Sequence, residues 1–98
     1  MTDFDYKQLD DTLQSRIRLA IMAALISVVE ADFNFLKDMV KTTDGNLSTH
    51  LRKLEEAGYV SMKKKFVDRK PQTKFKITEK GRRALAEHVN LLEKLIKK

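Results

Sequence analysis

The sequence has no cysteine and no tryptophan, one proline and two histidines. Without cysteine the chain can form no disulfide, thiolate metal site or cysteine nucleophile. Two histidines are too few for a histidine-rich metal site, so we expect neither a metal nor another cofactor. The longest apolar run, residues 19–29, is broken by Ser27 and is too short to cross a bilayer. The sequence also lacks a Gly-rich phosphate loop and a nucleophile beside a base, which argues against an enzyme.

Size and composition favour one globular domain. The chain has 98 residues, of which 42% are hydrophobic and 35% are charged. That is enough apolar material for a core and too little chain for two domains. We therefore expect a single domain over residues 1–98. We also expect a cytoplasmic protein, because a domain without disulfides is at ease in that compartment.

Charge is distributed unevenly along the chain. Residues 1–40 carry four bases and seven acids, whereas residues 41–98 carry sixteen bases and seven acids. Residues 61–76 alone hold seven bases against the single acid Asp68. Such a basic block indicates a polyanionic partner, with nucleic acid ahead of an anionic membrane surface. A lysine-rich surface that only keeps the protein in solution is the competing interpretation.

Apolar residues at helical spacing predict three helices in the first half of the chain. They cover residues 12–30, 33–40 and 44–57. A side chain that can accept backbone N–H groups precedes each helix, namely Asp10 or Asp11, then Asp32, then Thr43. Residues 1–9 are expected to form a loose arm.

The third of these helices has one apolar stripe and one polar face. Leu47, Leu51 and Leu54 recur at intervals that place them on one side, where they should be buried. Gly58 follows the helix, and a glycine there can supply the left-handed backbone that ends a helix.

After the third helix the apolar period changes from helical to alternating. Residues 59–62 and 73–78 are predicted to pair as a β-hairpin. Residues 67–72 are turn material, and Pro71, which has no N–H, should not lie inside a paired strand. The hairpin would carry most of the basic block at its tip.

A last helix is predicted over residues 79–96, and its apolar stripe is wider than one contact face needs. Pairing of this helix and the first helix with those of a second chain would bury the excess, so we expect a homodimer. The expected interface residues are Leu13, Ile17, Leu85, Val89, Leu92, Leu95 and Ile96. Use of the stripe within the monomer alone is the alternative.

The predicted order is helix, helix, helix, strand, strand, helix, which is a mainly α fold with a small β-hairpin (α+β). A short helix joined by a tight turn to a helix with a polar face is the helix-turn-helix pattern. A basic hairpin directly after it has the form of the wing of a winged helix.

The residues at these positions resemble a known family. Residues 43–60, TDGNLSTHLRKLEEAGYV, are similar to the recognition helix of winged-helix transcription regulators of bacteria and archaea. The group they resemble is compact and related to the ArsR and MarR repressors. RKPQTKF at 69–75 and TEKGR at 78–82 are similar to the wing return and the start of the last helix in that group.

The resemblance implies sequence-specific binding of double-stranded DNA by a homodimer. The third helix would lie in the major groove, and the wing along the backbone or minor groove. The residues that match the base-reading part of the helix are Asp44, Gly45, Asn46, Ser48, Thr49 and His50. The bases that we expect to contact phosphates are Arg52, Lys53, Lys63, Lys64, Lys65, Arg69, Lys70 and Lys74.

The turn before the third helix departs from the family pattern. Related sequences usually have Gly-Leu where this one has Lys41-Thr42. A lysine there is strained if its backbone is left-handed. The chain also lacks the cysteines and histidine clusters of metal-sensing relatives, so no effector site can be carried over.

We therefore predict a transcriptional regulator, acting as a homodimeric repressor that occupies its operator, with double-stranded DNA as its partner and no role at a membrane. One alternative is a non-specific architectural protein that binds DNA or RNA. Another is a winged helix used for protein–protein contact. The sequence leaves open the operator, the target genes and any effector.

Overall fold

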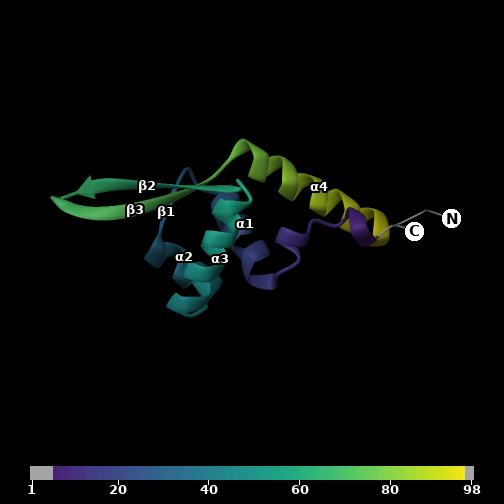
Figure 1. Ribbon diagram of the computed structural model, residues 1–98, viewed down its shortest axis with the longest axis horizontal. Coiled ribbons are helices and arrows are strands. Elements are labelled where there is room, and N and C mark those ends of the chain that lie inside the picture. Colours follow the sequence, from purple (N-terminus) through teal and green to yellow (C-terminus); the bar gives the residue numbers. More distant parts are fainter. Residues whose placement is uncertain (1–5, 97–98) are drawn as a thin grey trace.

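The computed structural model describes residues 6–96 and is elongated, with extents of 59 × 25 × 21 Å (Figure 1). Its helices and strands follow the predicted order, with short additional elements. The elements are η1 (Tyr6–Gln8), η2 (Asp11–Leu13), α1 (Arg16–Ile26), β1 (Ala31–Asp32), α2 (Phe33–Val40), α3 (Asp44–Glu56), β2 (Val60–Val67), β3 (Lys70–Ile77) and α4 (Glu79–Ile96). The fold is mainly helical with a small antiparallel sheet, which confirms the predicted fold class. Residues 1–5 of the predicted arm lie outside the described residues.

The region predicted as the first helix, residues 12–30, is divided. The carboxylate of Asp10 accepts the N–H of Thr12 at 2.8 Å and caps the start of the short 3₁₀ helix η2. Ser15 then has extended backbone (φ −123°, ψ 130°), and its hydroxyl accepts the N–H of Arg18 at 3.2 Å, so α1 begins only at the next residue. Two capping side chains therefore interrupt the helix that the apolar spacing predicted. The α1 helix also ends earlier than predicted, because the chain leaves it to form β1.

The α2 and α3 helices lie close to their predicted limits. Asp32 accepts a backbone N–H of α2 at 2.7 Å, and Thr43 accepts one of α3 at 3.2 Å, as their positions predicted. Lys41 after α2 is left-handed (φ 58°), a conformation that a lysine adopts only at a cost in backbone strain. Gly58 after α3 is left-handed as well (φ 80°), which confirms its predicted role.

The three strands form one antiparallel sheet in the order β1-β3-β2. β2 and β3 pair over all eight residues of each strand, so the hairpin is longer than predicted. Only Asp68 and Arg69 form its turn, and both have positive φ (51° and 66°), the geometry of two-residue hairpin turns. We call this hairpin, residues 60–77, the wing.

The prediction that Pro71 lies outside the strands is wrong. Pro71 lies in β3 opposite Phe66. In a hairpin with a two-residue turn, the N–H of the residue after the closing pair points away from the partner strand. β1 pairs with β3 only at Lys74 and Phe75, so no strand faces Pro71 on that side. A missing N–H leaves no bond unmade at such an open edge.

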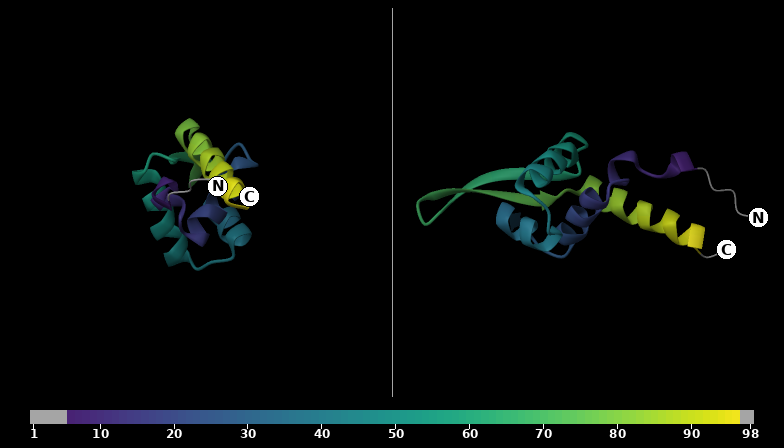
Figure 2. Two further views of the ribbon diagram at one scale, coloured as in Figure 1. Left: turned by 90° about the vertical axis from the view of Figure 1, so that its right-hand side faces the viewer. Right: turned by 90° about the horizontal axis from the view of Figure 1, so that it is seen from below.

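The core lies between the three helices α1–α3 and the base of the sheet. Its largest fully buried side chains are Leu13, Ile21, Met22, Leu25, Leu36, Leu47 and Leu54. The predicted stripe of Leu47, Leu51 and Leu54 is buried as expected. The wing and the outer half of α4 extend beyond this core in opposite directions (Figures 1 and 2). None of the described helices is long and apolar enough to cross a bilayer.

The wing and α4 meet at Gly81, in the first turn of α4. A Cβ atom at this position would lie 2.3 Å from the carbonyl oxygen of Tyr59 and 3.1 Å from Ile77. The Thr78 hydroxyl accepts the N–H of Gly81 at 2.9 Å and donates to the carbonyl of Gly58 at 2.6 Å. This close approach of backbones is the reason for a glycine here, which the sequence alone did not indicate.

Candidate nucleic-acid interface

The α3 helix turns its apolar stripe into the core and leaves a polar face in solvent. Most of the predicted base-edge and phosphate candidates on this helix are accessible. The exposed ones are Gly45, Asn46, Ser48, Thr49, Arg52 and Lys53. Gly45 has no atom within 4 Å of the position that a Cβ would take, so the first turn of α3 is open.

Asp44 is exposed but tied to the preceding helix. Its Oδ1 lies 2.7 Å from the Nζ of Lys37 in α2. The hydrogen bond and the charge of Asp44 raise the pKa of Lys37. The pair joins the start of α3 to α2, and Lys37 offsets a negative charge that would otherwise stand alone at this end of the helix.

His50 faces α1, away from the open side of α3. Its Nδ1 lies 3.0 Å from a terminal nitrogen of Arg18. A guanidinium can only donate, so Nδ1 accepts and the ring proton is assigned to Nε2. Burial lowers the pKa of His50, and the charges of Arg18 and Lys53 lower it further. His50 thus connects α3 to α1, and the contribution of Arg18 was not apparent from the sequence.

The wing has two faces of different chemistry, because paired residues of a hairpin point to the same side. One side, which we call the helix face, carries Met62, Lys64, Phe66, Pro71 and Thr73. The other, which we call the lysine face, carries Lys63, Lys65, Lys70, Lys74 and Lys76. The phosphate candidates on the wing are therefore divided between two opposite surfaces, apart from Arg69 in the turn.

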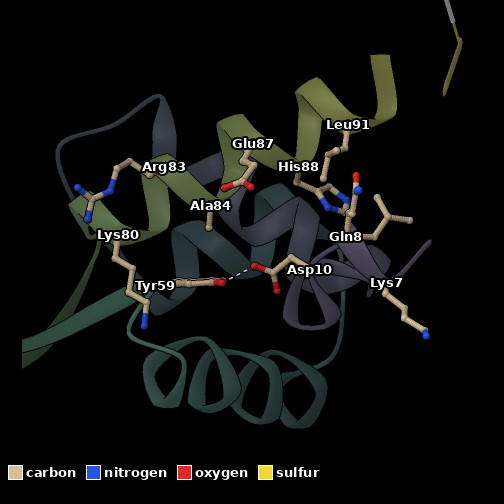
Figure 3. A pocket seen from close by; sticks show the side chains of 11 residues that line it. Lys7, Gln8, Asp10, Tyr59, Lys80, Arg83, Ala84, Glu87, His88 and Leu91 are labelled. Carbon is tan, nitrogen blue, oxygen red and sulfur yellow. Dashed lines mark hydrogen bonds between the residues drawn. The ribbon is translucent and has the colours of Figure 1, made fainter. Parts of the chain in front are cut away.

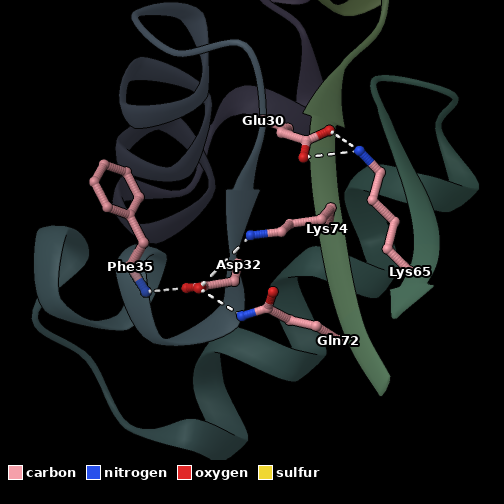
Figure 4. Close-up of polar contacts among 6 residues, drawn as sticks. All are labelled: Glu30, Asp32, Phe35, Lys65, Gln72 and Lys74. Carbon is pink, nitrogen blue, oxygen red and sulfur yellow. Dashed lines mark hydrogen bonds and ion pairs between the residues drawn. The ribbon is translucent and has the colours of Figure 1, made fainter. Parts of the chain in front are cut away.

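Two of the predicted phosphate contacts on the lysine face are engaged by acids of the same chain (Figure 4). Lys65 donates to both carboxylate oxygens of Glu30, at 2.8 and 2.9 Å, and this contact lowers the pKa of Glu30. Lys74 lies 3.9 Å from Asp32, which also accepts from Gln72 at 3.1 Å. These contacts brace the wing against β1 and the residue before it. Sequence reasoning missed them because the partners are far apart in the chain.

The four other basic candidates on the wing are Lys63, Lys64, Arg69 and Lys70. Their side chains are exposed, and within residues 6–96 none of them forms an ion pair. Of the six phosphate candidates on the wing, these four are therefore free to contact a polyanion.

A shallow groove of about 370 Å³ separates α3 from the helix face of the wing. Ser48 and Arg52 of α3 line it on one side, and Met62 and Thr73 of the wing line it on the other. The open side of α3 and the helix face of the wing thus border one continuous surface.

The arrangement is a helix-turn-helix followed by a basic hairpin and a long helix. The sequence profile of a family described as "Winged helix DNA-binding domain" matches residues 17–96. The chain belongs to this family. Its resemblance to winged-helix transcription regulators is thereby confirmed.

Comparisons of this winged-helix protein with individual proteins agree with the family assignment. It is 43% identical over 75 residues to an uncharacterised protein of Methanocaldococcus jannaschii, covering 76% of this chain and 82% of that protein. A solved transcriptional regulator homologue from Pyrococcus horikoshii OT3 superposes with a TM-score of 0.76 at 32% identity, covering 92% of this chain and 94% of that one. A MarR family regulator from Enterococcus faecalis V583 shares the fold, with a TM-score of 0.73 at 22% identity. The match covers 88% of this chain and 76% of that one.

At the far end of the winged-helix protein, α4 leaves apolar side chains in solvent. Val89 is 42% exposed, Leu95 41% and Ile96 80%. Ile17 and Leu92 are half-buried. Two other residues that we expected at a dimer interface, Leu13 and Leu85, are buried in the core of their own chain, so they are not available to a partner.

A cavity of about 400 Å³ lies between η1, Tyr59 and α4 (Figure 3). The Tyr59 hydroxyl donates a hydrogen bond to Asp10. Burial is the main cause that raises the pKa of Tyr59 to about 12, and the contact with Asp10 is the second. His88 also lines the cavity and is 5% exposed, and its Nδ1 has no hydrogen-bond partner in the described part of the chain. A histidine on a surface helix is ordinarily solvated, but the ring of His88 is buried and lies beside Gln8 of η1 (Figure 3).

Proposed function

We propose that this winged-helix protein is a sequence-specific regulator that binds double-stranded DNA as a homodimer and represses transcription by occupying an operator. The single observation that carries the proposal is the continuous surface on which the open face of α3 adjoins a wing with unpaired cations. Polar side chains at a helix face can read base edges, and cations beside them can hold the backbone.

On α3 we assign base contacts to Asn46, Ser48 and Thr49, whose short polar side chains are exposed. Arg52 and Lys53 are assigned to phosphates. Asp44 and His50 act indirectly, since each is engaged by a neighbouring helix. Gly45 allows a close approach of the helix start to the duplex.

On the wing we assign phosphate contacts to Lys63, Lys64, Arg69 and Lys70. Lys65 and Lys74 are given a bracing role, because their charges are already met by Glu30 and Asp32. Four of the six wing cations that we expected at the DNA are thereby assigned to phosphates, and the other two to support of the wing.

The proposed dimer pairs the outer halves of two α4 helices. Burial of Val89, Leu95 and Ile96 against a second copy would remove apolar surface from water, which favours association. Two-fold symmetry would present two α3 helices to half-sites about 34–36 Å apart, one turn of the duplex. Proteins of this kind act by binding, and we expect no enzymatic activity.

The test is selection of duplexes from a random pool at near-physiological salt, followed by sequencing. The proposal expects an enriched motif with two-fold symmetry. Retention of DNA without a motif would instead favour an architectural protein, because regulation requires discrimination between sequences. No retention of DNA at any salt concentration would reject the proposal and leave protein–protein contact as the function.

A further inference from the structure

We propose that Phe66 is an apolar wedge, which the wing inserts between base steps from the minor groove of the bound duplex. This inference rests on the proposed function and adds a deformation of the DNA to it. Phe66 is 80% exposed and lies two residues before the turn of the wing. An aromatic side chain left in water to this extent contributes little to folding and is available to a partner.

Phe66 lies on the same side of the wing as the groove beside α3. Met62 and Phe66 are both on the helix face, and Met62 lines the groove together with Ser48 and Arg52. A duplex that is seated on α3 therefore meets the face of the wing that carries Phe66.

The distance fits the spacing of the grooves. Met62 borders α3, and Phe66 lies four residues farther out on β2, about 14 Å at about 3.4 Å per residue. The minor groove is half a helical turn from the major groove, about 17 Å along the duplex. With α3 in the major groove, the outer part of the wing reaches the adjacent minor groove.

The residues around Phe66 suit duplex DNA, which has an anionic backbone on the outside and stacked bases inside. Lys64 shares its face and Arg69 follows in the turn, and neither has an ion-pair partner in the described residues. Pro71 lies directly opposite Phe66 and extends the apolar tip. Proteins that bend DNA from the minor groove insert Phe, Leu, Met or Pro between base steps while cations hold the backbone.

The lysine face of the wing is held in place by the contacts of Lys65 and Lys74 with Glu30 and Asp32 (Figure 4). Lys65 is adjacent to Phe66 in the chain and points to the opposite side. The brace therefore fixes the direction in which Phe66 points, which an insertion between bases requires.

The experiment uses duplexes that the wild-type protein retains from the random pool. Affinity is measured by fluorescence anisotropy, and bending by energy transfer between dyes on the two ends of the duplex. We expect Phe66→Ala to weaken binding about ten- to a hundredfold, since burial of one large apolar side chain is lost. We also expect it to abolish the bend. The salt dependence should not change, because no phosphate contact is removed.

Val67→Ala is the matched control. Val67 is 44% exposed and lies beside Phe66, but on the lysine face. This variant should bind and bend DNA like the wild type. Phe66→Leu, which keeps an apolar side chain, should retain most of the bend. Circular dichroism should show that all three variants fold, because both positions are exposed.

The outcomes separate the two proposals. Wild-type affinity and bending in Phe66→Ala would overturn the wedge and leave DNA binding intact. A wild-type protein that retains no duplex would overturn both. If Phe66→Ala leaves DNA binding unchanged but releases the protein from vesicles of anionic phospholipid, the side chain serves a membrane surface and the wedge is wrong.

Discussion

The wing and the outer half of α4 are alike in position and different in chemistry. Both extend beyond the core along the 59 Å axis of the molecule (Figure 1). The wing exposes lysines and Arg69 around the apolar side chain of Phe66, whereas the outer half of α4 exposes Val89, Leu95 and Ile96. An element that projects from the core gains little from burial within its own chain, so its side chains are free to suit a partner. The comparison indicates a polyanion at one end and an apolar surface at the other.

The largest effect is expected where the two ends join. Gly81→Ala should destabilise the protein by about 3 kcal/mol, because the added Cβ would overlap the carbonyl of Tyr59. Gly45→Ala is the matched control, since it also lies in the first turn of a helix but has free space around it. The control should stabilise the fold by up to about 1 kcal/mol. Urea unfolding of the two variants measures both values, and equal stabilities would show that the junction is not tightly packed.

The apolar end can be tested without changing the net charge. Leu95→Gln with Ile96→Gln should raise the dissociation constant of the dimer about a hundredfold, because two exposed apolar side chains lose their burial in the partner. Val29→Gln is the control, as Val29 is 78% exposed and lies in the segment between α1 and β1. Sedimentation or light scattering over a concentration series measures the dimer. A wild-type protein that stays monomeric at micromolar concentration would contradict the proposed dimer and show that the apolar end of α4 does not bind a second copy.

The charged end can be divided into free and engaged cations. Lys64→Ala with Arg69→Ala should reduce the slope of log affinity against log salt by about 1.8, since each lost phosphate contact removes about 0.9. Lys65→Ala with Lys74→Ala removes the same charge but should change the slope less, because those lysines already contact Glu30 and Asp32. A salt titration with a single duplex compares the pairs. Identical slopes would mean that net charge, and not the placement of cations, determines binding.

The smallest effect concerns the contact between α3 and α1. The folded state lowers the pKa of His50 below the ordinary value of about 6.5. Between the lowered pKa of the folded state and about 6.5, the unfolded chain binds more protons than the folded chain. The stability should therefore fall as the pH drops below about 6.5 and level off below the folded pKa. His50→Gln should lack this component. The check is the difference in melting temperature between the two proteins from pH 5 to 7.5, which should shrink toward acid.

Local signals in the sequence were sufficient for much of the fold. The caps at Asp32 and Thr43, the glycine after α3 and the apolar stripe of α3 each act within a few residues, so spacing and residue type reveal them. The division of the first helix was missed because a strong apolar period outweighed the capping ability of Ser15. The length of the wing was missed because Pro71 reads as turn material until it is known which edge of β3 is open.

The candidate interface likewise has features that local sequence patterns determine and features that only tertiary packing decides. The sequence by itself determined the order of the elements, the polar face of α3, the basic character of the wing and the apolar excess of α4, because each follows from periodicity or composition along one segment. Only the tertiary structure decided which of these side chains are free. Lys65 meets an acid thirty-five positions away, His50 meets Arg18 across two helices, and Leu13 and Leu85 enter the core. Contacts between distant segments depend on how the segments pack, and no local pattern encodes that.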